Sequence, residues 1–359
     1  MSVGATGLTR ATPDVEPLTA LLDEWKEPGY RVTQIREGLL AHRRPLADLT
    51  TLGRNLRERL AGALPETLEA VTEATSADAM TTKYLWRTTT TPVEIETVLM
   101  RNPGRATVCV SSQAGCAMAC TFCATGQAGL DRHLSAAEIV EQVLRAQHAS
   151  PERVSNVVYM GMGEPLANYE PVWESIERLH GDLGISARHL TVSTVGVVPG
   201  MRRLAREHLP VTLAVSLHAP EDELRARLVP LDRRYPIAEV LDAAAEVAGA
   251  HGRRVTFEYA VIDRVNDDLE HGHALGRLLR AWPGVGGSHV NLIPLNPTSG
   301  FPGRAPDPRR VRRFAEVLAE YGVGATVRRN RGTDIDAACG QLRERRGGAP
   351  VAPPTRMAP

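Results

Sequence analysis

Apolar residues recur at helical spacing along the N-terminal part of the chain. Leu18, Leu21, Leu22 and Trp25 open the pattern, and similar spacing continues to about residue 73. Apolar side chains three and four positions apart lie on one face of a helix, which packs against the rest of a protein. Residues 17–80 are therefore predicted to form a small helical accessory domain.

The pattern changes to alternation after that point. The run Val93-Glu-Ile-Glu-Thr-Val-Leu99 alternates apolar and polar residues and follows a turn rich in Thr and Pro. A period of two is typical of a half-buried strand. Residues 81–101 are therefore predicted to form a β-hairpin that links the accessory domain to the rest of the chain.

The two ends of the chain lack either pattern. Residues 1–16 are polar and mixed, and residues 343–359 are rich in Gly, Pro and Arg. Segments of this composition cannot bury enough apolar surface to offset the entropy of ordering, so both are predicted to be disordered tails.

From residue 102 onward, strand-like and helical runs alternate. Apolar and β-branched runs predict strands at 107–111, 157–160, 190–193, 211–216, 255–262, 290–294 and 325–328. Helical runs lie between most of them, at 136–147, 170–180, 224–227, 237–250, 269–280 and 308–321. This alternation predicts parallel strands with right-handed crossovers, as an open doubly wound sheet or a whole or partial barrel. Residues 102–342 are predicted to form this α/β core, with ligands at the C-terminal strand ends.

The composition narrows the class of protein. The N-terminus lacks the apolar stretch of a signal peptide, and no apolar run is long enough to cross a bilayer. Five cysteines, three of them in one loop, do not form a secreted disulfide framework, so a cytosolic protein is expected. The formal net charge is zero, which gives no general electrostatic reason for nucleic-acid binding. Arginine pairs recur; most are interpreted as solvated helix faces, although arginine also matches phosphate oxygens.

The most informative chemistry lies in the run Cys116-Ala-Met-Ala-Cys120-Thr-Phe-Cys123, which follows the first predicted strand of the core. Thiolates select soft metals, and three ligands from one loop suit a 4Fe–4S cluster whose fourth iron can bind a small molecule. A structural zinc site, with Cys109 or a histidine as the fourth ligand, is the main alternative. No second C-x2-C or H-x3-H pair is present to complete such a site, so the cluster is favoured.

A glycine-rich turn, Gly161-Met-Gly163-Glu164-Pro, follows the strand predicted at 157–160. Its glycines allow the backbone to approach a ligand closely, and Glu164 offers a carboxylate to a cationic amine; a tight turn alone is the alternative. Beside an open cluster, these groups suggest S-adenosylmethionine, which carries an amine, a carboxylate and a sulfonium. Further hydrogen-bonding groups lie at or just beyond three other predicted strand ends, namely Ser193, Ser216, Leu217, His218 and Asn296. Each alone is more often a structural residue, but together they could line the same ligand site at the C-terminal strand ends.

Two cysteines remain outside the loop. Cys109 lies in an apolar, strand-like run, where inert packing is the usual role of a free cysteine. Cys339 lies in a mixed, glycine-flanked segment after the last predicted strand. A thiol in such a segment, near the expected ligand site at the C-terminal strand ends, is a candidate nucleophile.

These motifs, in this order, resemble the RlmN-type radical S-adenosylmethionine RNA methyltransferases. The resemblance is carried by Cys109-Val-Ser-Ser-Gln-Ala-Gly-Cys116, the three-cysteine run, Gly-Met-Gly-Glu-Pro, Ser-Leu-His, Pro294-Leu-Asn-Pro297 and Asp-Ile-Asp-Ala-Ala-Cys-Gly-Gln-Leu342. It covers roughly residues 30–342 and is weakest in the helical N-terminal part. The lead-in to Cys339 is more similar to the enzymes that methylate carbon 2 of adenosine than to the related carbon 8 enzymes.

The resemblance implies a partial (β/α) TIM-like barrel and an enzyme that methylates carbon 2 of adenosine. The implied substrates are 23S ribosomal RNA, at the peptidyl-transferase centre, and tRNA, next to the anticodon. The implied cofactors are one 4Fe–4S cluster and two molecules of S-adenosylmethionine per turnover. The resemblance assigns Cys116, Cys120 and Cys123 to the cluster, and Gly163, Glu164, Ser193, Ser216, Leu217, His218 and Asn296 to contacts with S-adenosylmethionine.

The resemblance also gives three residues catalytic roles. Cys339 receives a methyl group and delivers it to the adenine, and Cys109 then attacks Cys339 to release the product through a transient disulfide. Glu96 accepts a proton, although Glu94 lies on the same face of the strand and geometry does not separate the two. A flavodoxin-like electron donor and a monomer without membrane contact are implied. A radical S-adenosylmethionine enzyme with a non-RNA substrate and a zinc-stabilised RNA-binding protein are the remaining alternatives.

Overall fold

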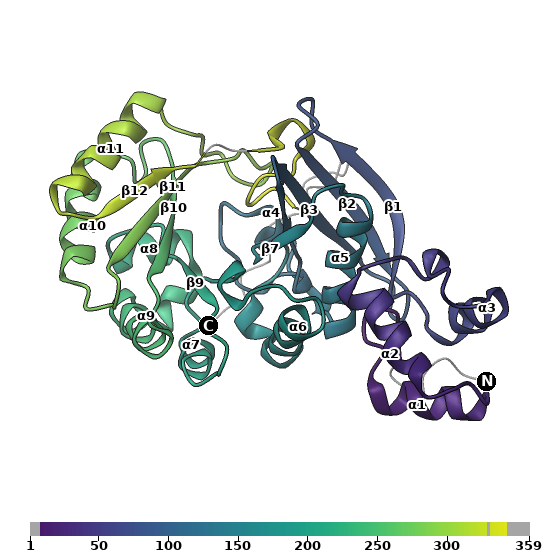
Figure 1. Cartoon of the computed structure of the whole chain (residues 1–359). Helices are drawn as coiled ribbons and strands as arrows, with labels where there is room; N and C mark the ends of the chain where they lie inside the picture. The colour runs from purple at the N-terminus through teal and green to yellow at the C-terminus, as the bar shows by residue number, and fades with distance from the viewer. Residues whose placement is uncertain (1–7, 329–330, 343–359) are drawn as a thin grey trace, which may run out of the picture.

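The computed structural model describes residues 8–328 and 331–342, and its centre is a ten-stranded sheet (Figure 1). A separate two-stranded ribbon is formed by β5 (Gln113–Gly115) and β6 (Leu130–His133). The strands of the large sheet are β1 (Leu68–Thr75), β2 (Thr81–Thr88), β3 (Glu94–Asn102), β4 (Arg105–Cys109), β7 (Val154–Tyr159), β8 (Leu190–Thr194), β9 (Thr212–Ser216), β10 (Val255–Val261), β11 (Ser288–Pro294) and β12 (Gly324–Val327).

The large sheet has an antiparallel and a parallel part. Its strand order is β1-β2-β3-β4-β7-β8-β9-β10-β11-β12, with antiparallel pairing from β1 to β4 and parallel pairing from β4 to β12. The order ends at β1 and β12, so the sheet of the described residues stays open. This arrangement confirms the predicted α/β fold with a partial barrel, and each predicted core strand is present within a few residues of its expected bounds.

Helices cover one side of the parallel part, as expected when each crossover packs on the sheet (Figure 1). Helices α5 and α6, α7 and α9, and α10 and α11 pack in pairs around it. The α-helices are α1 (Val15–Glu24), α2 (Tyr30–Arg36), α3 (Arg54–Ala63), α4 (Ala124–Gln127), α5 (Ala136–His148), α6 (Tyr169–Gly181), α7 (Val198–Leu204), α8 (Asp222–Leu228), α9 (Ile237–His251), α10 (Leu269–Ala281) and α11 (Pro308–Glu320). Short 3-10 or π turns lie at Glu37–Ala41, Leu46–Asp48, Pro165–Ala167, Ala187–His189, Pro230–Arg233 and Thr333–Ile335.

Local sequence explains where helix α5 begins and which face it buries. The Ser135 side chain accepts a hydrogen bond from the backbone N–H of Glu138, whose carboxylate accepts one from the backbone of Ser135. This reciprocal cap satisfies two N–H groups that a helix start otherwise leaves unpaired. Ile139 and Val143, four residues apart, are fully buried against the sheet.

The N-terminal part differs from the sequence prediction in two ways. The predicted helical domain includes residues 68–75, but these residues form strand β1, whose edge pairing with β2 outweighs the local preference. The predicted disordered tail is wrong for residues 8–16, because Leu8 is buried and Asp14 forms a double hydrogen bond with Arg178 at 2.6 and 3.0 Å. The predicted tail at 343–359 lies outside the described residues.

The predicted hairpin at residues 81–101 is present as the antiparallel pair β2 and β3. It is not a separate linker, because β3 also pairs with β4 and so joins the hairpin to the parallel strands in one continuous sheet. The division of the chain into an accessory domain and a core stays a prediction.

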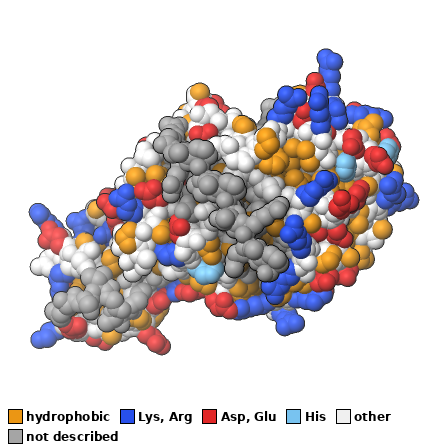
Figure 2. Space-filling model, turned by 180° about the vertical axis from the view of Figure 1, so that it is seen from behind, with side chains coloured by type: hydrophobic (Ala, Val, Ile, Leu, Met, Phe, Trp, Pro, Cys, Tyr) orange, Lys and Arg blue, Asp and Glu red, His pale blue; other side chains and the backbone are white. Residues whose placement is uncertain are grey.

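The surface shows an uneven distribution of charge. Lys and Arg side chains are more frequent on the half that carries α10, α11 and β12, on the right in Figure 2. In α11, Arg310 pairs with Asp267 and Arg313 pairs with Glu316, so these two arginines are partly neutralised. Within the described ranges, no helix combines the length and the apolar character needed to span a bilayer.

Candidate active site

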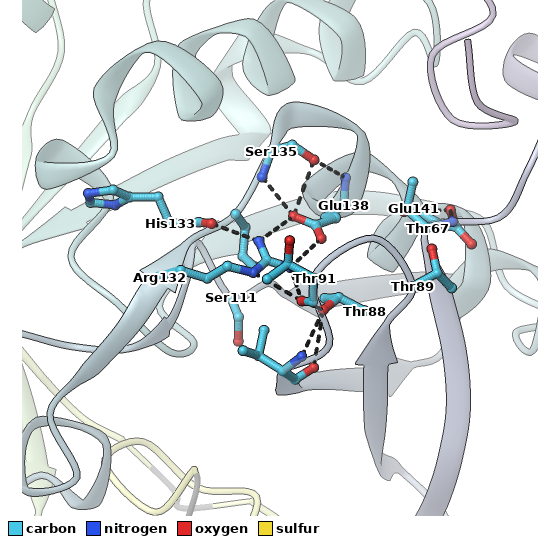
Figure 3. Close-up of polar contacts among 12 residues, drawn as sticks. Thr67, Thr88, Thr89, Thr91, Ser111, Arg132, His133, Ser135, Glu138 and Glu141 are labelled. Carbon is cyan, nitrogen blue, oxygen red and sulfur yellow. Dashed lines mark hydrogen bonds and ion pairs between the residues drawn. The ribbon is translucent and has the colours of Figure 1, made fainter. Parts of the chain in front are cut away.

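The three-cysteine loop leaves the C-terminal end of the first parallel strand, β4, as the sequence predicts. Strands β5 and β6 pair antiparallel at the base of this loop, and the backbone N–H of Cys116 donates to the carbonyl of Gly129 at 2.9 Å. Arg132 on β6 anchors the ribbon through two hydrogen bonds to Glu138, at 2.6 and 3.0 Å, and two to the carbonyl of Thr91, at 3.0 and 3.3 Å (Figure 3). The loop is therefore held rigidly at its base.

A first pocket lies over the C-terminal ends of the parallel strands. It brings together ten of the thirteen residues that the sequence analysis selected, although they come from five separate strand ends and from the segment after β12. Those residues are Cys116, Cys120, Cys123, Gly163, Glu164, Ser193, Ser216, His218, Asn296 and Cys339.

The glycine-rich turn after β7 packs closely against the chain itself. A Cβ atom at Gly161 would lie 2.6 Å from the carbonyl oxygen of Val110, and one at Gly163 would lie 2.6 Å from the Cβ atom of Gln113. Gly163 also has φ of +102°, which disfavours any side chain. Both glycines are thus required by backbone packing, and Gly163 additionally lines the first pocket.

Glu164 is buried, with two backbone partners. One carboxylate oxygen accepts from the N–H of Leu166 at 3.0 Å and the other from the N–H of Val195 at 2.9 Å. Burial raises the pKa of Glu164 to about 7, against the opposing effect of these hydrogen bonds. A cation in the pocket would favour the ionised carboxylate.

The turn after β9 is held by one buried arginine. Arg225 is fully buried and donates to the carbonyls of Leu217, Val195 and Ser216 at 3.0, 2.7 and 3.1 Å. Its remaining partner is Asp232 at 2.7 Å. Leu217 does not line the first pocket; its side chain is fully buried and its backbone N–H donates to the carbonyl of Glu258.

His218 faces the first pocket as a neutral imidazole. Its Nδ1 accepts a hydrogen bond from the N–H of Ala260 at 2.9 Å, which places the ring proton on Nε2. Burial, together with the charge of Arg225, lowers the pKa of His218 to about 3. Its backbone is left-handed, with φ of +60°.

Asn296 holds Cys339 in place, although Cys339 lies well beyond β12 in the sequence. Its side-chain Nδ2 donates to the carbonyl of Cys339 at 3.0 Å, while its Oδ1 is buried without a hydrogen-bond partner among the described residues. A buried acceptor without a partner is costly. In the wall of the first pocket, this oxygen is suited to an N–H donor on a ligand.

We call residues 331–342 the Cys339 segment. It lies across the sheet and forms hydrogen bonds on two sides. On one side, the N–H of Ala124 donates to the carbonyl of Gly340, and Thr125 Oγ1 donates to that of Leu342, both at 2.8 Å. On the other side, the N–H of Ala77 donates to Asp334 Oδ2 at 2.9 Å. The segment is thus fastened to both the three-cysteine loop and the antiparallel strands.

A second pocket lies beneath the Cys339 segment. Cys109 and Cys339 both line it, with Val98 and Met100 of β3, and with Arg105 and Arg331. Cys339 also lines the first pocket, so its thiol lies in the wall that the two pockets share. Burial raises the pKa of the Cys109 thiol well above its usual range, whereas Cys339 is exposed in the wall between the two pockets.

The structure separates the two candidate glutamates on β3. Glu96 is 7% exposed and forms an ion pair with Lys83 at 3.1 Å, whereas Glu94 is exposed and pairs with Arg87. Glu96 lies two positions from Val98, on the strand face that lines the second pocket, although Glu96 itself does not line either pocket.

The three thiols of the loop all line the first pocket. Thiolates select soft metals, and three of them from one loop suit a 4Fe–4S cluster that keeps one iron open. Within residues 8–328 and 331–342, no group of three His, Cys, Asp or Glu side chains is placed to hold one metal ion. Burial raises the pKa of the Cys116 thiol to about 12, and a bound metal ion would favour its thiolate.

Sequence reasoning missed several residues of the site. Glu258 and Arg328 line the first pocket, and Glu258 accepts a hydrogen bond from Asn291 at 2.7 Å. A single acid within the apolar strand run Val255-Thr-Phe-Glu-Tyr-Ala-Val261 was the available signal for Glu258. The role of Arg225 left no such signal, because it depends on which carbonyls the fold brings around the side chain.

Comparisons with known proteins define the class first. Residues 110–272 match the Radical SAM superfamily, which covers the three-cysteine loop and the strand ends up to β10. A radical SAM methyltransferase from Sphaerobacter thermophilus has a similar structure, with a TM-score of 0.87 and 46% identity over 94% of this chain and 100% of that one. The chain is therefore a radical S-adenosylmethionine methyltransferase of partial-barrel architecture.

The more specific relationship comes from sequence relatives. A protein of Parafrankia sp. (strain EAN1pec) named "Probable dual-specificity RNA methyltransferase RlmN" is 53% identical over 88% of this chain and 86% of its own length. A protein of the same name from Symbiobacterium thermophilum is 47% identical over 92% of this chain and 90% of its own length. The chain belongs to the RlmN family.

Proposed function

We propose that this enzyme methylates carbon 2 of adenosine in RNA, in 23S ribosomal RNA at the peptidyl-transferase centre and in tRNA next to the anticodon. Its relatives are named as dual-specificity RNA methyltransferases. The observation that carries the proposal is the position of Cys339 between two pockets, one shared with the three-cysteine loop and the other with Cys109.

The residues present fit the two cofactors that the family implies. Cys116, Cys120 and Cys123 would hold the 4Fe–4S cluster, and the other polar groups of the first pocket would hold S-adenosylmethionine. Glu164 offers a carboxylate to the amine, and the unpaired Oδ1 of Asn296 offers an acceptor. When bound, the two cofactors supply a methyl group from one S-adenosylmethionine and hydrogen abstraction from a second in each turnover.

Cys339 would carry the one-carbon unit between the pockets. Its thiol loses a proton as the sulfur–carbon bond forms and the sulfonium–methyl bond breaks. The methylated sulfur then presents its carbon to the adenine in the second pocket. Carbon 2 of adenine is not nucleophilic, so a covalent, radical route through Cys339 replaces a direct polar transfer that would fail.

Two further residues would complete the reaction. Glu96 accepts the proton that leaves carbon 2, since its carboxylate is on the strand face of the second pocket. Cys109 attacks the sulfur of Cys339 and a disulfide forms. The sulfur–carbon bond breaks, and the released carbon keeps the electron pair and takes up a proton to complete the methyl group of the product. An external electron donor, flavodoxin-like in our proposal, would supply electrons to the cluster, and reduction of the Cys109–Cys339 disulfide would restore both thiols.

The second pocket is the proposed place for the target adenine. Apolar side chains of Val98 and Met100 form part of its wall, while Asn102, Arg105 and Arg331 supply polar and cationic groups. Such a mixture suits a flipped-out base with a phosphate at the rim. We further propose that the enzyme works as a cytoplasmic monomer.

The test is anaerobic incubation of the reconstituted enzyme with labelled S-adenosylmethionine, reductant and either rRNA or tRNA, followed by nucleoside analysis. We expect label in 2-methyladenosine from both RNAs. Label in 8-methyladenosine alone, or cleavage of S-adenosylmethionine without any label in RNA, would contradict the proposal.

A further inference from the structure

Lys83 joins the proposed proton acceptor to the segment that carries the methylated cysteine. Its ammonium lies 3.1 Å from Glu96 Oε1 and donates to the carbonyl of Asp336 at 3.0 Å. Asp336 precedes Cys339 by three residues in the Cys339 segment. The chain contains two lysines, Lys26 and Lys83, so an arginine-rich sequence retains a lysine at this position.

The sheet register explains why these groups meet. Lys83 on β2 lies directly opposite Val98 on β3, and Leu85 lies opposite Glu96. Lys83 and Glu96 are therefore diagonal neighbours on one face of an antiparallel pair, within reach of a long side chain. Val98, on the same face, lines the second pocket.

The contact with Asp336 depends on the fold of the Cys339 segment. Asp336 has a left-handed backbone, with φ of +52°, which turns the chain toward Ala337 and Ala338, both of which line the second pocket. A non-glycine residue in this conformation requires support from its surroundings. The hydrogen bond from Lys83 supplies such support at the carbonyl of the strained residue.

Burial makes this arrangement specific. The side chains of Lys83 and Glu96 are 14% and 10% exposed. An ammonium at this depth needs partners in place of water, and its two partners are fixed by separate elements. If the Cys339 segment moved away, Lys83 would lose one partner and its hold on Glu96 would change.

We propose that Lys83 is a positioning residue that couples the Glu96 carboxylate to the seated Cys339 segment. It holds the Glu96 carboxylate in place, 3.1 Å from the ammonium, while the Cys339 segment covers the second pocket. This inference rests on the proposed function, in which Glu96 acts on the adenine that is attached to Cys339. Methylation of Cys339 itself does not involve Glu96, so the inference expects this step to persist when the charge of Lys83 is removed, with the remaining hydrogen bonds of the Cys339 segment in place.

The test compares two steps in the reconstituted enzyme with S-adenosylmethionine, reductant and RNA. Lys83→Met removes the charge and retains the aliphatic chain, and Lys83→Arg retains the charge. Arg87→Met is the matched control, because Arg87 forms an exposed ion pair with Glu94 across the same two strands. Mass spectrometry follows methylation of Cys339, denaturing gels follow the covalent RNA adduct, and nucleoside analysis follows the product.

We expect Lys83→Met to methylate Cys339 like the wild type but to form product at least about tenfold more slowly, with the adduct accumulating. Lys83→Arg should recover most of the rate, and Arg87→Met should match the wild type. Wild-type product formation in Lys83→Met would overturn the inference. So would an equal loss of Cys339 methylation and product, which would indicate general damage. A wild-type enzyme that makes no methylated RNA would instead refute the proposed function.

Discussion

Cys109 and Cys339 line one pocket, although Cys109 ends the first parallel strand and Cys339 lies beyond the last. The Cys339 segment brings them together by folding back across the sheet toward the three-cysteine loop. Only Cys339 of the two also lines the first pocket. The two thiols are therefore placed for different tasks, one between the pockets and one within the second.

The proposed cluster ligands are tested by single substitutions. Cys116→Ala, Cys120→Ala and Cys123→Ala should each lose cluster absorbance and all cleavage of S-adenosylmethionine, because a third thiolate has no substitute in the loop. Iron and sulfide analysis after anaerobic reconstitution measures this. Cys109→Ala, which removes a thiol from the second pocket, should retain full iron content. Zinc in place of iron, or full iron in any loop variant, would refute the assignment.

The two glutamates of β3 should differ in effect. Glu96→Gln should slow RNA methylation by about 10²–10⁴-fold, the usual contribution of a general base, while Cys339 still becomes methylated. Glu94→Gln should change the rate little, because its carboxylate is exposed and paired with Arg87. Rates are measured with saturating RNA. The opposite ranking of the two variants would assign the role to Glu94.

Arg225 tests how strongly the first pocket depends on a buried ion pair. Arg225→Met should lower the free energy of unfolding by about 3–5 kcal/mol, because it leaves Asp232 and three carbonyls without their donor. Denaturant unfolding of the apoprotein measures this. Adding Asp232→Asn should recover part of the loss, since no buried charge then remains unpaired. A loss of under about 1 kcal/mol would contradict the structural role.

The buried, neutral His218 should lower the free energy of unfolding in acid. Its folded pKa of about 3 lies below the value of 6.5 in an unfolded chain, so the unfolded state binds more protons between these values. Stability from this group is complete above pH 6.5 and is lost as the pH falls toward 3, by about 1.4 kcal/mol per unit.

The variant His218→Asn isolates this component. Asparagine tolerates the left-handed backbone and its Oδ1 can accept from the N–H of Ala260. The difference in unfolding free energy between wild type and variant should shrink by about 1.4 kcal/mol from pH 7.5 to 5.5. A difference that stays constant over this range would show that His218 is not held neutral.

The core could be predicted from sequence because its signals are local and repeated. The runs at 107–111 and Val157–Met160 are continuous and apolar, as is typical of parallel strands. The three-cysteine loop was placed correctly because ligands gather at the C-terminal ends of such strands. Strand β1 was missed, since its residues, mostly exposed, form a strand only by pairing with β2.

Contacts between distant elements could not be predicted. Nothing near Lys83 in the sequence indicates that its ammonium donates to the carbonyl of Asp336, because Asp336 lies near the other end of the sequence. The sequence likewise does not show that Glu96 is buried and Glu94 exposed. This difference depends on which part of β3 the Cys339 segment approaches. Motifs identify the reacting groups, whereas the fold decides which neighbours hold them.

The two thiols of the second pocket test the mechanism rather than the family. Cys339→Ala should never become methylated and should form no covalent bond with RNA. Cys109→Ala should methylate Cys339, attach it to adenosine and then stall, because only a second thiol can attack the alkylated sulfur and break the bond through a disulfide. The Cys109 pKa is raised by burial, so the attack requires loss of its proton within the second pocket.

Denaturing gels distinguish these outcomes. Cys109→Ala enzyme with RNA should give a slow-migrating band that nuclease removes, and the Cys109→Ala, Cys339→Ala double variant should not. Mass spectrometry of the nuclease-treated band should place the residual nucleotide on Cys339, the thiol shared by both pockets. If the two single variants behaved alike, with no trapped species, Cys109 could not be the residue that releases the product. A trapped nucleotide on another residue would instead show that the methyl carrier is not Cys339.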